Sequence, residues 1–126
     1  MNVVDSSGWV EYFQDSKRAD LFALPIEQRD ELIVPVIALY EVHKILSRQM
    51  PADVVDTFLD VMRLGRVVEL TDLRAIAASK ASGTHGLAMA DAAMYSIAQE
   101  FKATFWTQDV DYKGLSNVKL FAKTGV

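Results

Sequence analysis

Hydrophobic positions in this chain follow two periods, and each period predicts one kind of element. Short apolar runs bounded by polar residues, such as ELIVP and ATFWT, are typical of buried β-strands. Longer segments with apolar residues three and four positions apart, such as residues 52–64, are typical of amphipathic helices. Strands are predicted at residues 3–4, 31–35, 66–70, 103–107 and 117–121. Helices are predicted at residues 6–13, 18–24, 36–48, 52–64, 72–82 and 89–102.

Prolines and small residues set several of the predicted boundaries. Pro25 is expected to stop the second helix, and Pro51 is expected to open the helix that Gly65 ends. The segment SKASGTHG, residues 79–86, is predicted to form the loop that leads to the last helix.

The order of these elements predicts the fold class. Strands that alternate with helices need crossover connections, and these connections place the strands parallel to one another. We therefore expect an α/β fold, a three-layer α/β/α sandwich with a mainly parallel central sheet. A length of 126 residues fits a single domain that spans the whole chain, 1–126.

Acidic residues recur where this sheet would bind a ligand. In open parallel sheets, ligands bind beyond the carboxyl ends of the strands. Asp5, Asp109 and Asp111 directly follow two predicted strands. Asp91 lies at the start of the last predicted helix, and Glu41 lies about a turn and a half into the helix after the second strand. Segments far apart in the chain are thus predicted to bring carboxylates to one edge.

Asp91 is the least expected of these acids, because it sits within the apolar segment GLAMADAAMYSIAQEF. A buried carboxylate without a partner is costly, so a helix terminus, a cation or a basic side chain should use it. Its carboxylate could cap the helix that follows it. Asp5 could cap the helix beginning at Ser6 or Ser7 in the same way.

The other acids also have structural explanations. Glu41 could pair with Lys44 or Arg48 on its own helix. Asp109 and Asp111 could be ordinary turn residues before a glycine. The case for a functional site therefore rests on the joint placement of the acids.

Clustered carboxylates repel one another unless protons or cations intervene. Ligation by oxygen alone suits hard cations such as Mg²⁺ or Mn²⁺. Such ions lower the pKa of a bound water and stabilise the leaving oxygen of an in-line displacement. The predicted chemistry is metal-assisted hydrolysis of a phosphodiester.

Composition narrows the function classes. The chain has no cysteine, which excludes disulfide frameworks, thiolate nucleophiles and cysteine-ligated zinc. A net charge of −4 is unusual for a nucleic-acid-binding domain, although two bound divalent cations would bring it to zero. No apolar run approaches the ~20 residues of a membrane span, and the first residues lack a signal-peptide pattern. We expect a cytoplasmic protein with no membrane partner.

Four segments together resemble the PIN-domain ribonucleases, and most closely the VapC toxins of toxin–antitoxin operons. NVVDSS is similar to the family's opening strand with its first acid, Asp5. VPVIALYEVHKIL and GLAMADAAMYSIA resemble the segments that carry the second and third acids, Glu41 and Asp91. ATFWTQDVDYKGLSNVKLF resembles the closing motif, with Thr107, the fourth acid Asp109 and an aromatic residue, Tyr112.

The resemblance implies more than the patterns do. It implies an endoribonuclease, the toxin of a type II module, that cleaves tRNA or rRNA with one or two Mg²⁺ or Mn²⁺ ions and so stops translation. It also implies a homodimer and a cognate VapB-like antitoxin. Asp5, Glu41, Asp91 and Asp109 would hold the metal and carry catalysis. Ser6 and Thr107 would support the ligands, and Asp111 is placed at the periphery.

Basic side chains are the remaining candidates for contact with RNA. Lys44, Arg48, Lys80 and Lys113 are predicted to bind phosphate groups. The two histidines are expected on the surface or in loops, because the metal scheme needs no imidazole. The helical pair 36–48 and 52–64 could present apolar surface to a dimer mate or an antitoxin helix. The alternative function is a non-catalytic PIN-like domain that binds protein or RNA.

Overall fold

Five short strands form the central layer of the structure, a computed structural model that describes residues 1–123. They lie side by side in the order β3-β2-β1-β4-β5, and every neighbouring pair is parallel. The predicted α/β class with a mainly parallel sheet is therefore confirmed. The strands are β1 (Asn2–Val4), β2 (Leu32–Pro35), β3 (Arg66–Val68), β4 (Thr104–Thr107) and β5 (Val118–Leu120).

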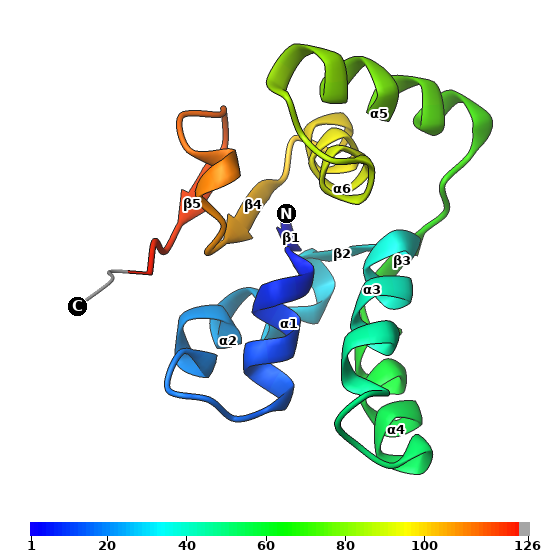
Figure 1. Cartoon of the computed structure of the whole chain (residues 1–126), viewed down its shortest axis with the longest axis vertical. Coiled ribbons are helices and arrows are strands. Elements are labelled where there is room, and N and C mark those ends of the chain that lie inside the picture. Colours follow the sequence, from blue (N-terminus) through cyan, green and yellow to red (C-terminus); the bar gives the residue numbers. More distant parts are fainter. Residues whose placement is uncertain (124–126) are drawn as a thin grey trace.

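Helices cover both faces of this sheet (Figure 1). Helix α6 packs on one face with α5 outside it, and α1 and α2 lie on the opposite face. Helices α3 and α4 form a neighbouring pair beside α1. The α-helices in the described residues are α1 (Ser6–Phe13), α2 (Ala19–Glu27), α3 (Val36–Leu46), α4 (Ala52–Met62), α5 (Asp72–His85) and α6 (Met89–Glu100). Two short 3₁₀ segments are η1 (Arg29–Glu31) and η2 (Val110–Tyr112).

The core lies between the central strands and the helices that cover them. Val3, Ile33 and Phe105 face one another in register on β1, β2 and β4, and all three are fully buried. A parallel sheet covered on both faces buries both sets of side chains, which explains why its strands are continuous apolar runs. This burial holds the carboxyl ends of β1 and β4 side by side.

Two predicted helix ends were wrong. Helix α2 continues past Pro25 to Glu27, because Phe22 and Ile26 bury the same face of the helix in the core. A proline costs a helix one backbone hydrogen bond, and packing here outweighs that loss. Helix α5 continues to His85, so residues 79–86 do not form the predicted loop. Gly86 ends α5 in the left-handed conformation, with φ of 70°, and its N–H donates to the Ser82 carbonyl.

Within residues 1–123, no helix is both long enough and apolar enough to cross a bilayer.

Candidate metal site

The pairing of β1 with β4 sets the position of the site. The Asp5 N–H donates to the Trp106 carbonyl at 2.9 Å, one step beyond the last residue of β1. Asp5 therefore leaves the sheet at the same edge as Asp109, which follows β4 by two residues. This edge was predicted because ligands of open parallel sheets bind beyond the carboxyl ends of the strands.

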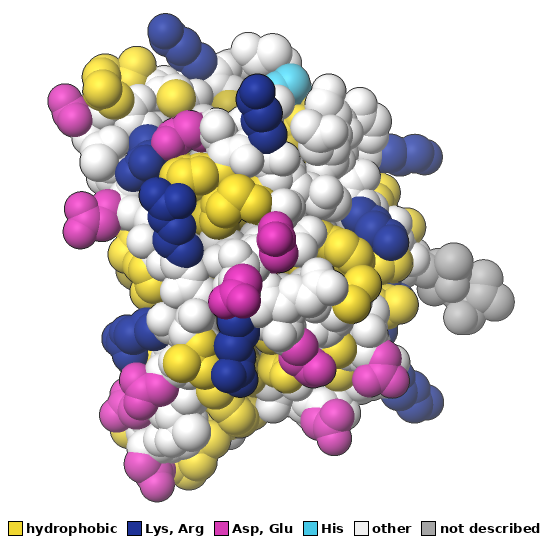
Figure 2. All heavy atoms as spheres, turned by 180° about the vertical axis from the view of Figure 1, so that it is seen from behind, with side chains coloured by type: hydrophobic (Ala, Val, Ile, Leu, Met, Phe, Trp, Pro, Cys, Tyr) yellow, Lys and Arg dark blue, Asp and Glu magenta, His cyan; other side chains and the backbone are white. Residues whose placement is uncertain are grey.

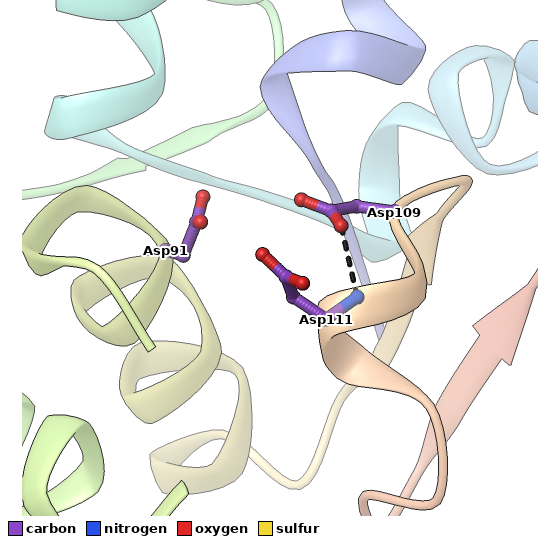
Figure 3. Close-up of side chains that lie close together, drawn as sticks. All are labelled: Asp91, Asp109 and Asp111. Atoms are coloured by element: carbon purple, nitrogen blue, oxygen red, sulfur yellow. Dashed lines mark hydrogen bonds between the residues drawn. The ribbon is translucent and has the colours of Figure 1, made fainter. Parts of the chain in front are cut away.

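Three carboxylates converge beside this edge (Figure 3). Asp91 comes from the first turn of α6, Asp109 from the loop after β4, and Asp111 from η2. Each offers an oxygen, and the three oxygens lie within 4.8 Å of one another. The Asp111 N–H donates to the Asp109 carboxylate at 2.9 Å, which fixes the turn that brings both acids forward. Geometry thus gives Asp111 a place beside Asp109, where sequence reasoning had set it at the periphery.

Asp5 lies outside this group of three but adjoins it. Its carboxylate is 4% exposed and accepts hydrogen bonds from the Thr107 hydroxyl at 2.7 Å and the Ser7 hydroxyl at 3.2 Å. Burial raises the pKa of Asp5 to about 7, despite the Thr107 hydrogen bond, and the charge of Asp91 adds to the rise. The Thr107 oxygen also accepts from the Asp109 N–H at 3.0 Å, so one hydroxyl connects both acids.

Glu41 reaches the site from α3. The Ser6 hydroxyl donates to its carboxylate at 2.6 Å, and the structure shows no ion pair of Glu41 with Lys44 or Arg48 within residues 1–123. Burial raises the pKa of Asp91, and the charges of Glu41, Asp109 and Asp111 raise it further. The predicted acids therefore act on one another electrostatically, although only three of the five carboxylates form the close group.

The helix-cap explanation of two acids was wrong in its details. Ala88 is the N-cap of α6, and Asp91 is the third residue of the helix rather than its opening residue. The α6 macrodipole still favours a carboxylate in that first turn. Asp5 does occupy the N-cap position of α1, but its side chain makes no capping hydrogen bond. Both side chains are therefore free of a capping role.

Sequence reasoning did not anticipate the hydroxyl of Tyr112. This side chain is fully buried, and among the described residues its hydroxyl has no hydrogen-bond partner. Burial raises its pKa, and the charges of Asp5 and Asp91 raise it further. In the sequence, Tyr112 is only an aromatic residue next to the two acids of QDVDY. That pattern does not distinguish a core ring from a ring whose polar end faces a site.

The four predicted basic residues are all exposed on the surface. Lys44 and Arg48 are exposed on α3 and just after it, and Lys113 is exposed directly after η2. Lys80 lines a shallow cavity beside Gln99. Gln99 lies eight residues along α6 from Asp91, roughly 12 Å of helix, so Lys80 is remote from the acids.

The two histidines lie on α3 and at the end of α5. His43 is exposed on α3, and its ring lies 3.4 Å from the Ser47 hydroxyl. His85 ends α5, with its ring edge-to-face against Tyr95. Within residues 1–123, neither joins the group of three acids.

The donor set fits a hard divalent cation. All three close donors are carboxylate oxygens, which Mg²⁺ and Mn²⁺ prefer over nitrogen or sulfur. Ligands on opposite sides of a Mg²⁺ ion are about 4 Å apart, comparable with the 4.8 Å spread of the acids. Two of these carboxylates, Asp91 and Asp109, are partly buried and Asp111 is exposed, and a cation between them would relieve their repulsion.

Comparisons with known proteins identify the family and the fold of this chain. Residues 3–118 match the family model of the PIN domain. Comparison with curated protein sequences gave no significant match. Three solved structures of similar fold are a toxin–antitoxin complex from Klebsiella pneumoniae, VapC20 from Mycobacterium tuberculosis, described as a sarcin–ricin loop cleaving toxin, and VapBC2 from Rickettsia felis bound to a DNA fragment from their promoter.

The similarity covers almost the whole of each protein. The Klebsiella complex has a TM-score of 0.83 at 13% identity, covering 98% of this chain and 100% of that chain. VapC20 has a TM-score of 0.77 at 14% identity, covering 92% and 95%. VapBC2 has a TM-score of 0.71 at 14% identity, covering 96% and 97%. At identities this low, the TM-scores establish a common fold. The family model covers most of the sequence. The chain therefore belongs to the PIN-domain family.

Proposed function

We propose that this protein is a Mg²⁺- or Mn²⁺-dependent endoribonuclease, the toxin of a type II toxin–antitoxin pair. The observation that carries the proposal is the convergence of acids from four chain-distant segments at the carboxyl edge of one parallel sheet. Membership of the PIN family supports the same chemistry. The substrates we propose are tRNA or rRNA in the cytoplasm, and their cleavage would stop translation.

Asp91, Asp109 and Asp111 are the acids placed to hold a first cation, because their oxygens lie closest together. Asp5 and Glu41 adjoin that group and would complete the site or hold a second ion. A bound Mg²⁺ or Mn²⁺ would lower the pKa of a water ligand and stabilise the leaving oxygen of the phosphodiester.

Two hydroxyl groups keep the acids in place. Ser6 donates to Glu41, and Thr107 donates to Asp5 while accepting from the Asp109 N–H. Each hydroxyl is buried, so the carboxylates it holds have few alternative orientations. Such hydrogen bonds typically change metal affinity or activity by 10–100-fold when they are removed.

Basic side chains on the surface are the candidates for contact with the phosphate groups of RNA. Figure 2 shows Lys and Arg side chains interspersed with Asp and Glu side chains on one face of the molecule. Lys113 directly follows η2 and is our first choice for a phosphate contact, with Lys44 and Arg48 on the α3 side. Lys80 is the weakest of the four predicted contacts because of its distance from Asp91.

A cavity between α1, α2 and α4 suits an antitoxin helix. Its volume is about 490 Å³, and Phe58 in its wall stacks on Phe13 with ring centroids 4.5 Å apart. Val55, Leu59 and Met62 of α4 instead face the core, so α4 gives only part of its apolar side to this surface. A VapB-like segment with an amphipathic helix would bury the cavity. The similar VapBC2 structure contains both toxin and antitoxin, which supports a partner of this kind.

A second apolar surface supports the proposed homodimer. Leu73 and Ile76 of α5 and Met89 of α6 are 75%, 56% and 78% exposed. Met89 lines an apolar cavity of about 420 Å³ between the two helices, and Leu73 and Ile76 lie elsewhere on α5. Exposed apolar side chains and an apolar cavity on one helix pair are typical of protein–protein interfaces.

Cleavage assays on purified protein test the enzymatic proposal. Total tRNA and ribosomal RNA are incubated with antitoxin-free protein in Mn²⁺, in Mg²⁺ and in EDTA. We expect endonucleolytic cutting with either metal and none in EDTA. Asp91→Asn should abolish cutting while its circular dichroism spectrum stays that of the wild type.

Asp56→Asn is the matched control, because it makes the same chemical change at an exposed position on α4. It should cut RNA at the wild-type rate. Absence of cutting on every RNA, together with no Mn²⁺ binding by calorimetry, would refute the nuclease and favour a non-catalytic binding domain.

A further inference from the structure

The Tyr112 hydroxyl is the one buried side-chain polar atom in residues 1–123 that lacks a hydrogen-bond partner. Native proteins leave very few buried polar atoms unpaired, because an unpaired buried hydroxyl forfeits its bonds to water. The side chain is fully buried, so water at the surface does not compensate for the missing bond. A buried hydroxyl without a partner therefore indicates that a ligand, or another state of the protein, supplies the missing hydrogen bond.

Packing fixes the position of this hydroxyl. The Tyr112 ring contacts Phe105 of β4 with centroids 4.7 Å apart and Tyr95 of α6 with centroids 6.1 Å apart. The ring is therefore held between the sheet and the helix that carries Asp91. Tyr112 also closes η2, the segment that carries Asp111.

Tyr112 packs on the face of α6 that carries Asp91. Asp91 and Tyr95 are four residues apart on α6 and so share one face of the helix, and the Tyr112 ring contacts Tyr95 there. Burial raises the pKa of Asp91 and the Tyr112 hydroxyl lowers it, which agrees with this placement. Asp5 and Asp109 lie close enough to raise the pKa of Tyr112 along with its burial. In this setting a neutral O–H can act only as a donor to a carboxylate or to a ligand held by one.

We propose that Tyr112 is a positioning residue that donates a hydrogen bond to the Asp91 carboxylate when a divalent cation draws the acids together. In the cation-loaded protein this hydrogen bond would orient the Asp91 carboxylate. This inference rests on the proposed metal site and adds an uncharged hydrogen-bond donor beside its five carboxylates.

The test compares Tyr112→Phe with wild type, because this change removes only the hydroxyl and keeps the packed ring. Mn²⁺ affinity is measured by calorimetry, and the melting temperature is measured in EDTA and in Mn²⁺. We expect Mn²⁺ affinity to fall about tenfold. The melting temperature in EDTA should equal or exceed that of wild type, because the variant loses an unpaired polar atom. Cleavage should recover when Mn²⁺ is raised above the new Kd.

Tyr95→Phe is the matched control. Its hydroxyl donates to the Ser116 carbonyl at 2.8 Å, so this variant should melt lower in EDTA and bind Mn²⁺ with wild-type affinity. Mn²⁺ affinity of Tyr112→Phe within twofold of a metal-binding wild type would overturn the inference and leave the nuclease proposal intact. A wild type that binds no Mn²⁺ would overturn both. A Tyr112→Phe variant less stable in EDTA, with unchanged affinity, would make Tyr112 a core residue only.

Discussion

The buried carboxylate of Asp5 should make the stability of the metal-free protein fall as the pH rises. Asp5 is 4% exposed, and burial raises its pKa from 3.8 to about 7. At pH values between 3.8 and about 7, Asp5 carries a proton in the folded protein and has released it in the unfolded chain. Stability therefore declines with pH across this interval, because the folded state binds more protons than the unfolded state. The contribution is present at low pH and is lost as the pH rises through 7.

The size of this effect follows from the shift. A pKa difference of about 3 units corresponds to about 4 kcal/mol over the full interval. Between pH 5 and pH 8, the portion from Asp5 is about 3 kcal/mol. Asp5→Asn removes the titrating group and keeps an oxygen that can accept the Thr107 hydrogen bond. The variant should therefore lack this portion of the pH dependence.

Urea denaturation in EDTA, followed by circular dichroism at several pH values, measures the free energy of unfolding of wild type and of Asp5→Asn as a function of pH. The quantity of interest is the difference between Asp5→Asn and wild type, since other titrating groups cancel in it. Asp56→Asn, exposed on α4, controls for the loss of one surface charge. Curves for Asp5→Asn and wild type that stay parallel within about 0.5 kcal/mol from pH 5 to pH 8 would refute the argument.

Metal binding gives the same prediction a second readout. A cation at this site must displace the Asp5 proton below pH 7, so Mn²⁺ affinity should rise with pH up to about 7. Calorimetry in buffers of different ionisation heat would count the released proton. Affinity that does not change between pH 5.5 and pH 7.5 would show that Asp5 does not take part in binding.

Three further predictions concern Ser6, Gly8 and Gly86. Ser6→Ala should lower Mn²⁺ affinity about tenfold in calorimetry, because Glu41 loses its donor, and unchanged affinity would remove Glu41 from the site. Gly8→Ala should lower the free energy of unfolding by about 1–3 kcal/mol in urea, since an added Cβ would lie 2.6 Å from Phe22, and wild-type stability would contradict that packing. Gly86→Ala should cost about 1 kcal/mol in the same assay because φ is 70° there and no atom crowds the Cβ, so a larger loss would point to a missed contact.

Much of the fold could be predicted from local patterns. The continuous apolar runs of β2 and β4 reflect burial on both faces of a parallel sheet, and this burial is visible in the residues themselves. Ends set by capping were also predictable, as at Thr71, whose side chain accepts from the Arg74 N–H at the start of α5. The predicted helix end at Pro25 was wrong because the free energy lost with one backbone hydrogen bond was smaller than that gained by packing the rest of α2.

The candidate site likewise combines features that the sequence predicts with features that only the tertiary structure sets. The sequence by itself determined which residues are acidic and that they lie near one edge of the predicted sheet, and its resemblance to the PIN family implied Asp5, Glu41, Asp91 and Asp109 as the ligands. Tertiary structure decided the rest, because contacts between Ser6 and Glu41, or between Thr107 and Asp5, join positions 35 and 102 residues apart. No local period encodes such distances.

The tertiary structure also decided the places of Asp111 and Tyr112. The turn of η2 brings Asp111 beside Asp109, and the packing of α6 against β4 leaves the Tyr112 hydroxyl buried among the acids. A sequence pattern reports whether a side chain is apolar or polar. The direction of one oxygen depends on the backbone turn and on the rings packed around it.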